Sequence, residues 1–206
     1  IEMAVRLYKK EKNWIRPLDA DIEGLFHPET NKLFRNGAKA KRWLLQDPKG
    51  QTIGRIAAFV NPKMKEKQPT GGVGFFECVE NQEAAFLLLD TAKAWLQSEG
   101  MEAMDGPVNF GERDNWWGLH VNPYNAEPTW GMFYHQKYYR AFFENYGFQD
   151  YFQQYTFLLP IPEVEARKVV RPALFEIANR IYSTPGYDFK HVSKKNLPKF
   201  AEDFRI

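Results

Sequence analysis

The chain has 206 residues, a formal net charge of +2, 44% hydrophobic residues and 16% aromatic residues. A chain of this length and apolar content can bury one substantial core, which excludes an intrinsically disordered protein. No apolar run reaches the roughly 20 residues that a membrane-spanning helix needs, so we expect no membrane partner. The single cysteine, Cys78, excludes an intramolecular disulfide and predicts a reducing, cytoplasmic location.

Basic residues occur in short groups that acidic or apolar residues interrupt. These groups lie at Lys9–Lys10, Lys39–Arg42, Lys63–Lys67 and Lys194–Lys195. Such groups are typical of a solvated surface, so nucleic acid is a disfavoured partner. Scattered histidines without the spacing of metal ligands predict no metal site; they are His27, His120, His135 and His191.

The first elements in chain order are the end of a helix at Val5–Lys9 and a short helix at Ala20–Phe26. Two strands follow, at Ala40–Gln46 and Thr52–Val60. Between them, Asp47–Gly50 places proline and glycine where a tight turn needs them. The pattern therefore predicts an antiparallel hairpin.

A third strand, Val73–Val79, leads into the strongest helix of the chain, Gln82–Glu99. Asn81 is suited to cap the start of this helix, and Gly100 to end it. One broad apolar face is predicted from residues at helical spacing, which are Leu88, Leu89, Ala92, Trp95 and Leu96.

The remaining elements up to residue 160 are two strands, a long loop and a helix. We expect a strand at Met104–Phe110, a loop over Gly111–Thr129, a helix at Lys137–Tyr146 and an aromatic strand at Gln149–Leu159. The order is therefore β-β-β-α-β-α-β. It predicts an α/β (α+β) fold with a mixed, mostly antiparallel sheet flanked by helices.

This order resembles the GNAT family of N-acyltransferases. Short stretches sharpen the resemblance to a bacterial GNAT-like subfamily that has no assigned reaction. They are Gly54–Val60, Gly74–Cys78, Asp105–Arg113 and Phe142–Phe148. The resemblance covers most of residues 5–160, and it implies a GNAT-like fold.

The resemblance also implies that acetyl-CoA or another acyl-CoA binds in a V-shaped gap between central strands. Its pyrophosphate would lie where the third strand meets the long helix, against Val79, Asn81, Gln82, Glu83 and Ala84. This stretch departs from the family pattern, because it has no glycine and no basic residue. Glu80 and Glu83 would repel an anionic ligand, so an ordinary helix with an acidic first turn is the alternative.

Two residues are candidates for acid–base catalysis. Glu77 lies in an apolar strand and would take a proton from the attacking amine; the alternative is an ion pair with Arg55 on the neighbouring strand. Phe143 occupies the position at which many GNAT enzymes carry a tyrosine that protonates the leaving thiolate. Tyr146 is the candidate acid in its place, and simple packing is the alternative for this tyrosine.

The loop after the fourth strand is the candidate binding surface for a small-molecule amine. Loops that leave the carboxyl ends of strands are common ligand sites. The predicted contacts are Asn109, Glu112, Arg113, Asn115 and Trp116. The alternative is that these charges pair with one another and the tryptophans hold the loop in place.

Two domains are predicted. Residues 1–160 form a GNAT-like domain that lacks its first strand. Residues 161–206 form a linker helix from Pro172, a strand at Tyr187–Val192 and a helix from Asn196, which would begin a second GNAT-like half. The alternative is a C-terminal extension that supplies the missing strand to the first sheet.

The leading functional hypothesis is an acyl-CoA-dependent N-acyltransferase for an amine acceptor. The alternative is a non-catalytic GNAT-fold binding or scaffold module with a degenerate CoA site. A third hypothesis takes the acyl group from a carrier protein or a charged RNA. A homodimer stays open.

Overall fold

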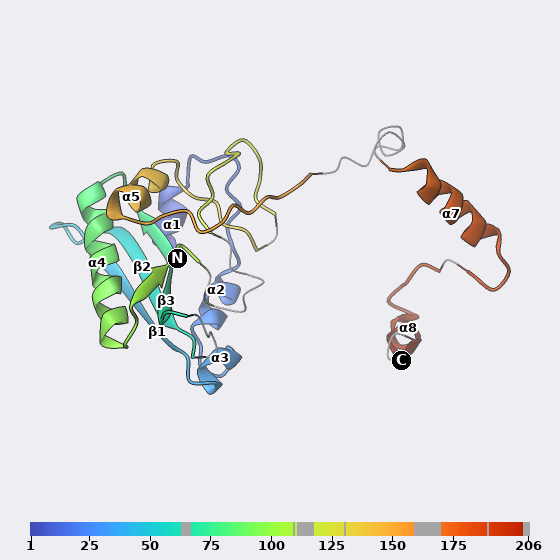
Figure 1. The fold of residues 1–206 in the computed structure, drawn as a ribbon, viewed down its shortest axis with the longest axis horizontal. Helices are drawn as coiled ribbons and strands as arrows, with labels where there is room; N and C mark the ends of the chain where they lie inside the picture. The colour runs from blue at the N-terminus through green and yellow to red at the C-terminus, as the bar shows by residue number, and fades with distance from the viewer. Residues whose placement is uncertain are drawn as a thin grey trace. The chain divides into compact units, whose positions relative to one another are not determined.

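The computed structural model describes residues 1–62, 67–108, 110, 118–129, 131–158, 170–188 and 190–203. The chain divides into two compact units, residues 1–154 and residues 155–206 (Figure 1). Each unit is considered separately below. The candidate functional residues that the structure describes all lie in the first unit.

The first unit contains a four-stranded sheet with the order β1-β2-β3-β4. Its strands are β1 (Lys39–Gln46), β2 (Thr52–Val60), β3 (Thr70–Cys78) and β4 (Ala103–Asp105). The first three strands pair antiparallel, and β4 pairs parallel with β3. The predicted mixed, mostly antiparallel sheet flanked by helices is therefore confirmed.

The predicted hairpin between β1 and β2 is formed. The Asp47 carboxylate accepts hydrogen bonds from the backbone amides of Lys49 and Gln51, both at 2.9 Å. Gly50 has a φ of +81°, a conformation that glycine adopts without steric cost. These contacts turn the chain and bring the two strands into register.

Helix α4 (Gln82–Ser98) covers one face of the sheet (Figure 1). The Asn81 side chain accepts a hydrogen bond from the Ala84 amide at 3.0 Å, and Gly100 has a φ of +83° just beyond the helix. Both predicted helix ends are confirmed. The helix buries its apolar stripe against the sheet in a core that includes Leu88, Leu89, Ala92, Leu96, Ile56, Val73 and Phe76.

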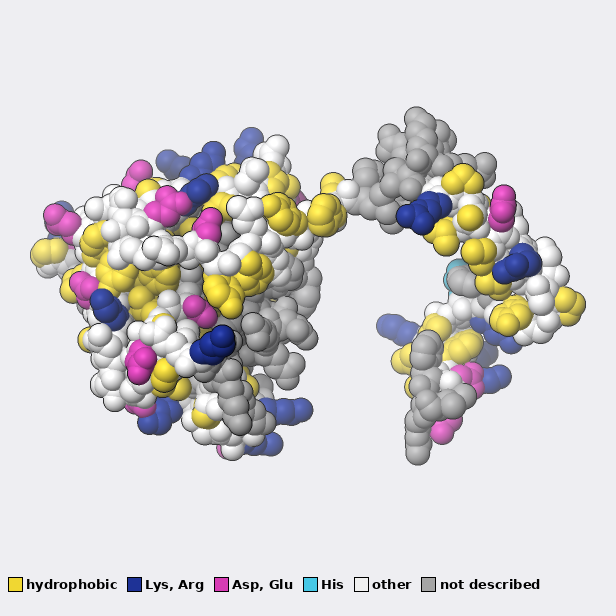
Figure 2. Space-filling view, viewed as in Figure 1, with side chains coloured by type: hydrophobic (Ala, Val, Ile, Leu, Met, Phe, Trp, Pro, Cys, Tyr) yellow, Lys and Arg dark blue, Asp and Glu magenta, His cyan; other side chains and the backbone are white. Residues whose placement is uncertain are grey.

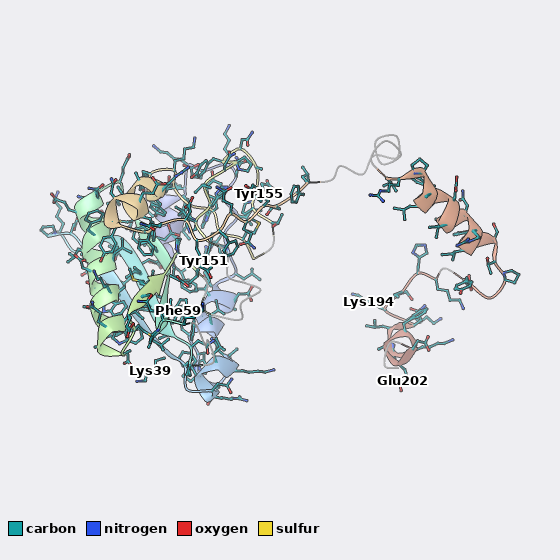
Figure 3. The ribbon with its side chains drawn as sticks, viewed as in Figure 1. Lys39, Phe59, Tyr151, Tyr155, Lys194 and Glu202 are labelled. Atoms are coloured by element: carbon teal, nitrogen blue, oxygen red, sulfur yellow. The ribbon has the colours of Figure 1, made fainter. Side chains whose placement is uncertain are left out.

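Three short helices, α1 (Glu2–Leu7), α2 (Asp19–Leu25) and α3 (Lys32–Arg35), precede the sheet. Figure 1 shows α2 and α3 on the side of the sheet away from α4. A second, aromatic core fills this side. It is built around Phe59 (Figure 3) and includes Val108, Phe110, Phe26, Phe34 and Phe75.

Strands β3 and β4 differ in length from the sequence prediction. β3 starts earlier, at Thr70, because its glycines leave room for large neighbours: a Cβ on Gly71 would lie 2.4 Å from Leu96, and one on Gly72 would lie 2.1 Å from Phe59. β4 is only Ala103–Asp105, because Gly106 and Pro107 follow and proline has no amide to donate to a neighbouring strand.

The predicted strand at Gln149–Leu159 is wrong over the described residues 149–158, which form no strand. Their aromatic side chains are exposed, as Tyr151 (79%) and Phe157 (89%) illustrate; Figure 3 labels Tyr151 and Tyr155 along this segment. A strand needs a paired neighbour, and among the described residues no strand pairs with this segment. Upstream of it lies helix α5 (Tyr139–Tyr146), which confirms the predicted helix there.

The second unit contains α7 (Pro172–Ser183) and α8 (Leu197–Asp203). The strand predicted at Tyr187–Val192 is not formed in the described residues 187–188 and 190–192. None of this unit's described residues is buried. Hydrophobic side chains are therefore on the surface of α7 (Figure 2), including Leu174, Ile177 and Ile181. The assignment of this unit to a second GNAT-like half stays a prediction.

In the part of the chain that the structure describes, no helix is long and apolar enough to cross a membrane.

We predict that Gly74→Ala destabilises the first unit. A Cβ at this position would lie 1.9 Å from the Val108 carbonyl oxygen, which is backbone and cannot rotate away. Because overpacking a tight site costs about 1–3 kcal/mol, the free energy of unfolding should fall by about 3 kcal/mol or more. Urea denaturation followed by circular dichroism measures the change. Gly118→Ala is the control, since no atom of the described residues lies within 4 Å of its Cβ position. Equal stability of the two variants would contradict this packing.

Candidate functional site

The candidate site lies in the second half of β3, after a bulge. The pairing register shifts between Arg55 and Ala57, so that Phe75 and Phe76 face one residue of β2. Phe75 has a φ of +51° and is the one non-glycine residue with positive φ in the described part of the chain. A bulge bends its strand and interrupts the hydrogen-bond ladder. The bulge therefore redirects the two residues that follow, Glu77 and Cys78.

Glu77 is 8% exposed and is surrounded by hydrogen-bond donors. Its Oε2 accepts from the hydroxyls of Tyr8 at 2.7 Å and Tyr139 at 2.8 Å, and its Oε1 lies 3.5 Å from Nη2 of Arg55. Burial raises the pKa of Glu77, while Arg55 and the two hydroxyls oppose that rise. The predicted cross-strand pair of Arg55 and Glu77 is therefore confirmed, and these surroundings favour it over a free catalytic base.

Tyr8 brings α1 to the sheet. It follows the last residue of α1, is 1% exposed, and stacks on Trp14 with ring centroids 5.2 Å apart. The ring of Tyr134 meets it edge-on at 6.0 Å, and the Tyr134 hydroxyl donates to Glu11 at 3.2 Å. The tyrosine that donates to the buried carboxylate is thus itself held in a cluster of aromatic rings.

Two tyrosines at the start of α5 hold the backbone of Cys78. The Cys78 amide donates to the Tyr139 hydroxyl at 2.8 Å, and the Tyr138 hydroxyl donates to the Cys78 carbonyl at 2.9 Å. Because Tyr139 also donates to Glu77, one side chain joins the end of β3 to its own buried carboxylate.

Beside this cluster lies a buried histidine. His135 is 4% exposed, its Nδ1 accepts a hydrogen bond from the His120 amide at 3.0 Å, and its ring centroid lies 6.0 Å from that of Tyr139. Burial, and then the nearby His120, lower the pKa of His135 to about 3. The imidazole is therefore neutral and an acceptor at Nδ1.

The predicted cofactor residues surround the start of α4. The Val79 amide donates to Ile53 at 2.9 Å, the Asn81 side chain caps the Ala84 amide, and Gln82 accepts from Asn145 at 2.7 Å. Glu83 is exposed in the first helical turn. Backbone amides of this turn could hold a phosphate, but the side-chain cap and the acidic residue are also features of the alternative, an ordinary helix start.

Tyr146, the predicted acid, is not brought to Glu77. Its hydroxyl donates to Asp90 at 2.7 Å, and its ring packs edge-on against Phe86 at 5.2 Å. Phe143, which stands at the family's tyrosine position, is buried against Phe76. The role of Tyr146 as an acid stays a prediction.

Sequence reasoning missed Tyr8 and Tyr139 as partners of Glu77. Tyr139 had a usable signal, because it lies four residues before Phe143 and therefore on the same face of the helix. Tyr8 had no such signal, since it contacts Glu77 from 69 positions away in the sequence.

The predicted amine-binding residues Asn109, Glu112, Arg113, Asn115 and Trp116 lie outside the described residues. In the described residues, no group of three or more His, Cys, Asp or Glu side chains could hold a metal ion.

Comparison with known proteins gives distant similarities, and no family model matches. The chain is 26% identical to Protein YghO of Escherichia coli K12 over 149 residues. This aligned region covers 69% of the chain and 36% of that protein. It is 27% identical over 113 residues to a bacterial ceramide synthase of Caulobacter vibrioides, covering 53% of the chain and 29% of that protein. The chain thus spans about a third of the length of these curated relatives. A solved structure of a candidate acetyl transferase from Pyrococcus furiosus matches at a TM-score of 0.40 and 12% identity, covering 78% of this chain and 91% of that one.

We predict that Glu77→Gln destabilises the first unit. The substitution removes the negative charge opposite Arg55, whose side chain is only 15% exposed. Because removing one partner of a buried pair costs about 3–5 kcal/mol, we expect the free energy of unfolding to fall by about 3 kcal/mol in urea denaturation. Glu144→Gln is the matched control, since Glu144 pairs with Arg140 on the surface of α5 and should change stability little. A Glu77→Gln protein as stable as the parent would contradict the structural role of this pair.

We also predict that His135 makes stability pH-dependent. Its pKa is about 3 in the folded chain against an ordinary value of 6.5, so below pH 6.5 the unfolded chain binds a proton that the folded chain does not. The contribution is complete above pH 6.5 and is lost as pH falls toward 3, at about 1.4 kcal/mol per pH unit. Denaturation between pH 7 and pH 4 should show a shallower slope for His135→Gln than for the exposed control His27→Gln. Parallel slopes would rule out this origin.

Proposed function

We propose that this chain forms the acyl-binding domain of an N-acyltransferase that transfers an acyl group from acyl-CoA to an amine. The observation that carries the proposal is the shape of β3. Among the described residues the strand pairs parallel with β4 at Thr70–Gly72, bulges at Phe75, and is followed by α4. The resemblance implies an acyl-CoA in a V-shaped gap between central strands, with its pyrophosphate where this strand meets the long helix.

The reaction would need no covalent enzyme intermediate. The amine nitrogen attacks the thioester carbonyl, a C–N bond forms, the C–S bond breaks, and the thiolate leaves with the electron pair. The nitrogen loses a proton and the thiolate gains one. Polarisation of the carbonyl would need a hydrogen-bond donor at the developing oxyanion, because a fixed dipole stabilises that charge strongly.

Within this proposal Glu77 supports the site rather than taking the proton itself. Three donors already occupy its carboxylate: Tyr8, Tyr139 and Arg55. The base role predicted for Glu77 would require one of these donors to be released. Its supporting role is to fix the hydroxyl of Tyr139, which in turn holds the end of β3.

For the acceptor we propose a long-chain amine. One relative is a bacterial ceramide synthase, and a ceramide is the amide of a fatty acid with a long-chain amino alcohol. The activity of that whole protein comes to this chain only as a proposal, because the match spans 29% of it. The amine would contact the predicted loop residues 109–116.

A second candidate function is a binding module without catalysis. The observation that favours it is the start of α4, where Asn81 already caps the helix and Glu80 and Glu83 are exposed. Two carboxylates at this position oppose the polyphosphate of CoA.

Ligand titration separates these two functions. If acyl-CoA binds the folded chain, the melting temperature should rise with the concentration of acetyl-CoA or palmitoyl-CoA, because a ligand that binds only the folded state stabilises it. Incubation of palmitoyl-CoA with a long-chain amine should then yield the amide, detected by mass spectrometry. Palmitate alone is the control for non-specific effects of the acyl chain. No shift with any acyl-CoA at millimolar concentration would favour the binding module.

A further inference from the structure

The loop between α1 and α2, here called loop 9–18, exposes two large aliphatic side chains. Ile15 is 52% exposed and Leu18 is 63% exposed, and Arg16 and Pro17 between them are exposed as well. Neither aliphatic side chain belongs to a core cluster of the described residues. A single exposed leucine is common, whereas two aliphatic side chains within four residues of one loop form a small apolar contact surface.

Contacts on both sides of Ile15 hold this loop in place. Trp14 stacks on the buried Tyr8, with ring centroids 5.2 Å apart. Arg16 pairs with Asp19, the first residue of α2, at 2.7 Å. The loop is therefore restrained in an arrangement in which its aliphatic side chains face solvent.

The exposed charges at the start of the loop are all positive. Lys9, Lys10 and Lys12 are exposed. The acidic residue among them, Glu11, is partly buried and accepts a hydrogen bond from the Tyr134 hydroxyl at 3.2 Å. Three ammonium groups thus lie in the same short loop as the exposed aliphatic side chains, which suits a partner that is both anionic and apolar.

Acidic residues limit how far this positive surface extends. Asp19 is paired with Arg16, so the three lysines are the groups that attract an anionic partner. Glu2 at the start of α1, and Asp21 and Glu23 in α2, are exposed and would repel such a partner. Contact is therefore expected through the loop itself and not along the two helices beside it.

We propose that loop 9–18 docks the chain onto an anionic lipid bilayer, with Ile15 and Leu18 inserted among the headgroups and the three lysines against lipid phosphates. Burial of aliphatic side chains and attraction of lysines to anionic lipid act together in such peripheral contacts. A protein partner would need a matching pocket for each side chain, whereas a bilayer accepts protruding side chains of any shape. The expectation of no membrane partner rested on the lack of a spanning segment, which surface docking does not need.

Docking goes beyond the proposed function and does not depend on it. A long-chain amine partitions into bilayers, so docking would bring the proposed enzyme to its acceptor. Vesicle binding is measured without acyl-CoA or amine, so the two proposals fail or succeed separately.

Vesicle flotation of the full chain tests the docking. We expect binding to vesicles of equal parts phosphatidylcholine and phosphatidylglycerol, and binding about tenfold weaker or less to phosphatidylcholine alone. The combined variant Ile15→Asn and Leu18→Asn should bind the anionic vesicles at least about tenfold more weakly, because both aliphatic side chains lose their burial. Leu87→Asn, at a residue of α4 that is 53% exposed, is the matched control and should bind within about twofold of the parent.

Two outcomes would overturn the proposal. One is a parent chain that does not bind anionic vesicles, whatever the acyl-CoA titration gives. The other is a loop variant that binds as the parent does; loss of binding by Ile177→Asn in that case would assign the lipid contact to the exposed face of α7. Equal melting temperatures of the variants show that the comparison is between folded proteins.

A fluorophore on the loop locates the contact. Cys78 is 0% exposed, so a thiol reagent carrying the environment-sensitive NBD group labels the introduced cysteine of Leu18→Cys. Its emission should shift to the blue when anionic vesicles are added, because the fluorophore enters a less polar environment. Leu87→Cys, labelled in the same way, should show no shift. No shift at position 18, or equal shifts at the two positions, would contradict docking through loop 9–18.

Discussion

The buried carboxylate of Glu77 is the interaction on which the first unit depends. It receives hydrogen bonds from Tyr8, which follows α1, and from Tyr139 in α5, and it pairs with Arg55 on β2. Three parts of the chain that are distant in sequence, the end of α1, α5 and β2, therefore meet at the Glu77 carboxylate of β3. Removing a charge from water is costly, and the cost is offset only when all of its partners are in place. Loss of any one of these partners would therefore leave a buried polar or charged group without its partner.

The same constraint connects the core to the candidate site. Tyr139 holds both Glu77 and the Cys78 amide, and the residues that follow Cys78 lead into the capped start of α4. A change in the position of α5 would therefore also displace the end of β3 and the start of α4. Local geometry at this site is determined by side chains that are themselves buried, which favours a preorganised arrangement.

The elements predicted correctly from the sequence are those that local physics determines. The hairpin follows from the turn residues Asp47–Gly50, and α4 follows from apolar residues at helical spacing with Asn81 and Gly100 at its ends. Each of these signals lies within a few residues of the element that it defines. The Arg55–Glu77 pair was also predictable, because two charged residues inside neighbouring apolar strands can satisfy each other.

The features that could not be predicted depend on contacts distant in sequence. The aromatic residues of 149–158 are typical of a strand, yet a strand also needs a neighbour, and a neighbour is not encoded in the segment itself. Tyr8 could not be assigned to Glu77 for the same reason.

The exposed apolar face of α7 has a thermodynamic consequence. Side chains such as Leu174, Ile177 and Ile181 each contribute about 1.5–3 kcal/mol when fully buried, and none of them is buried here. Any surface that buries these side chains would therefore add to the stability of the second unit.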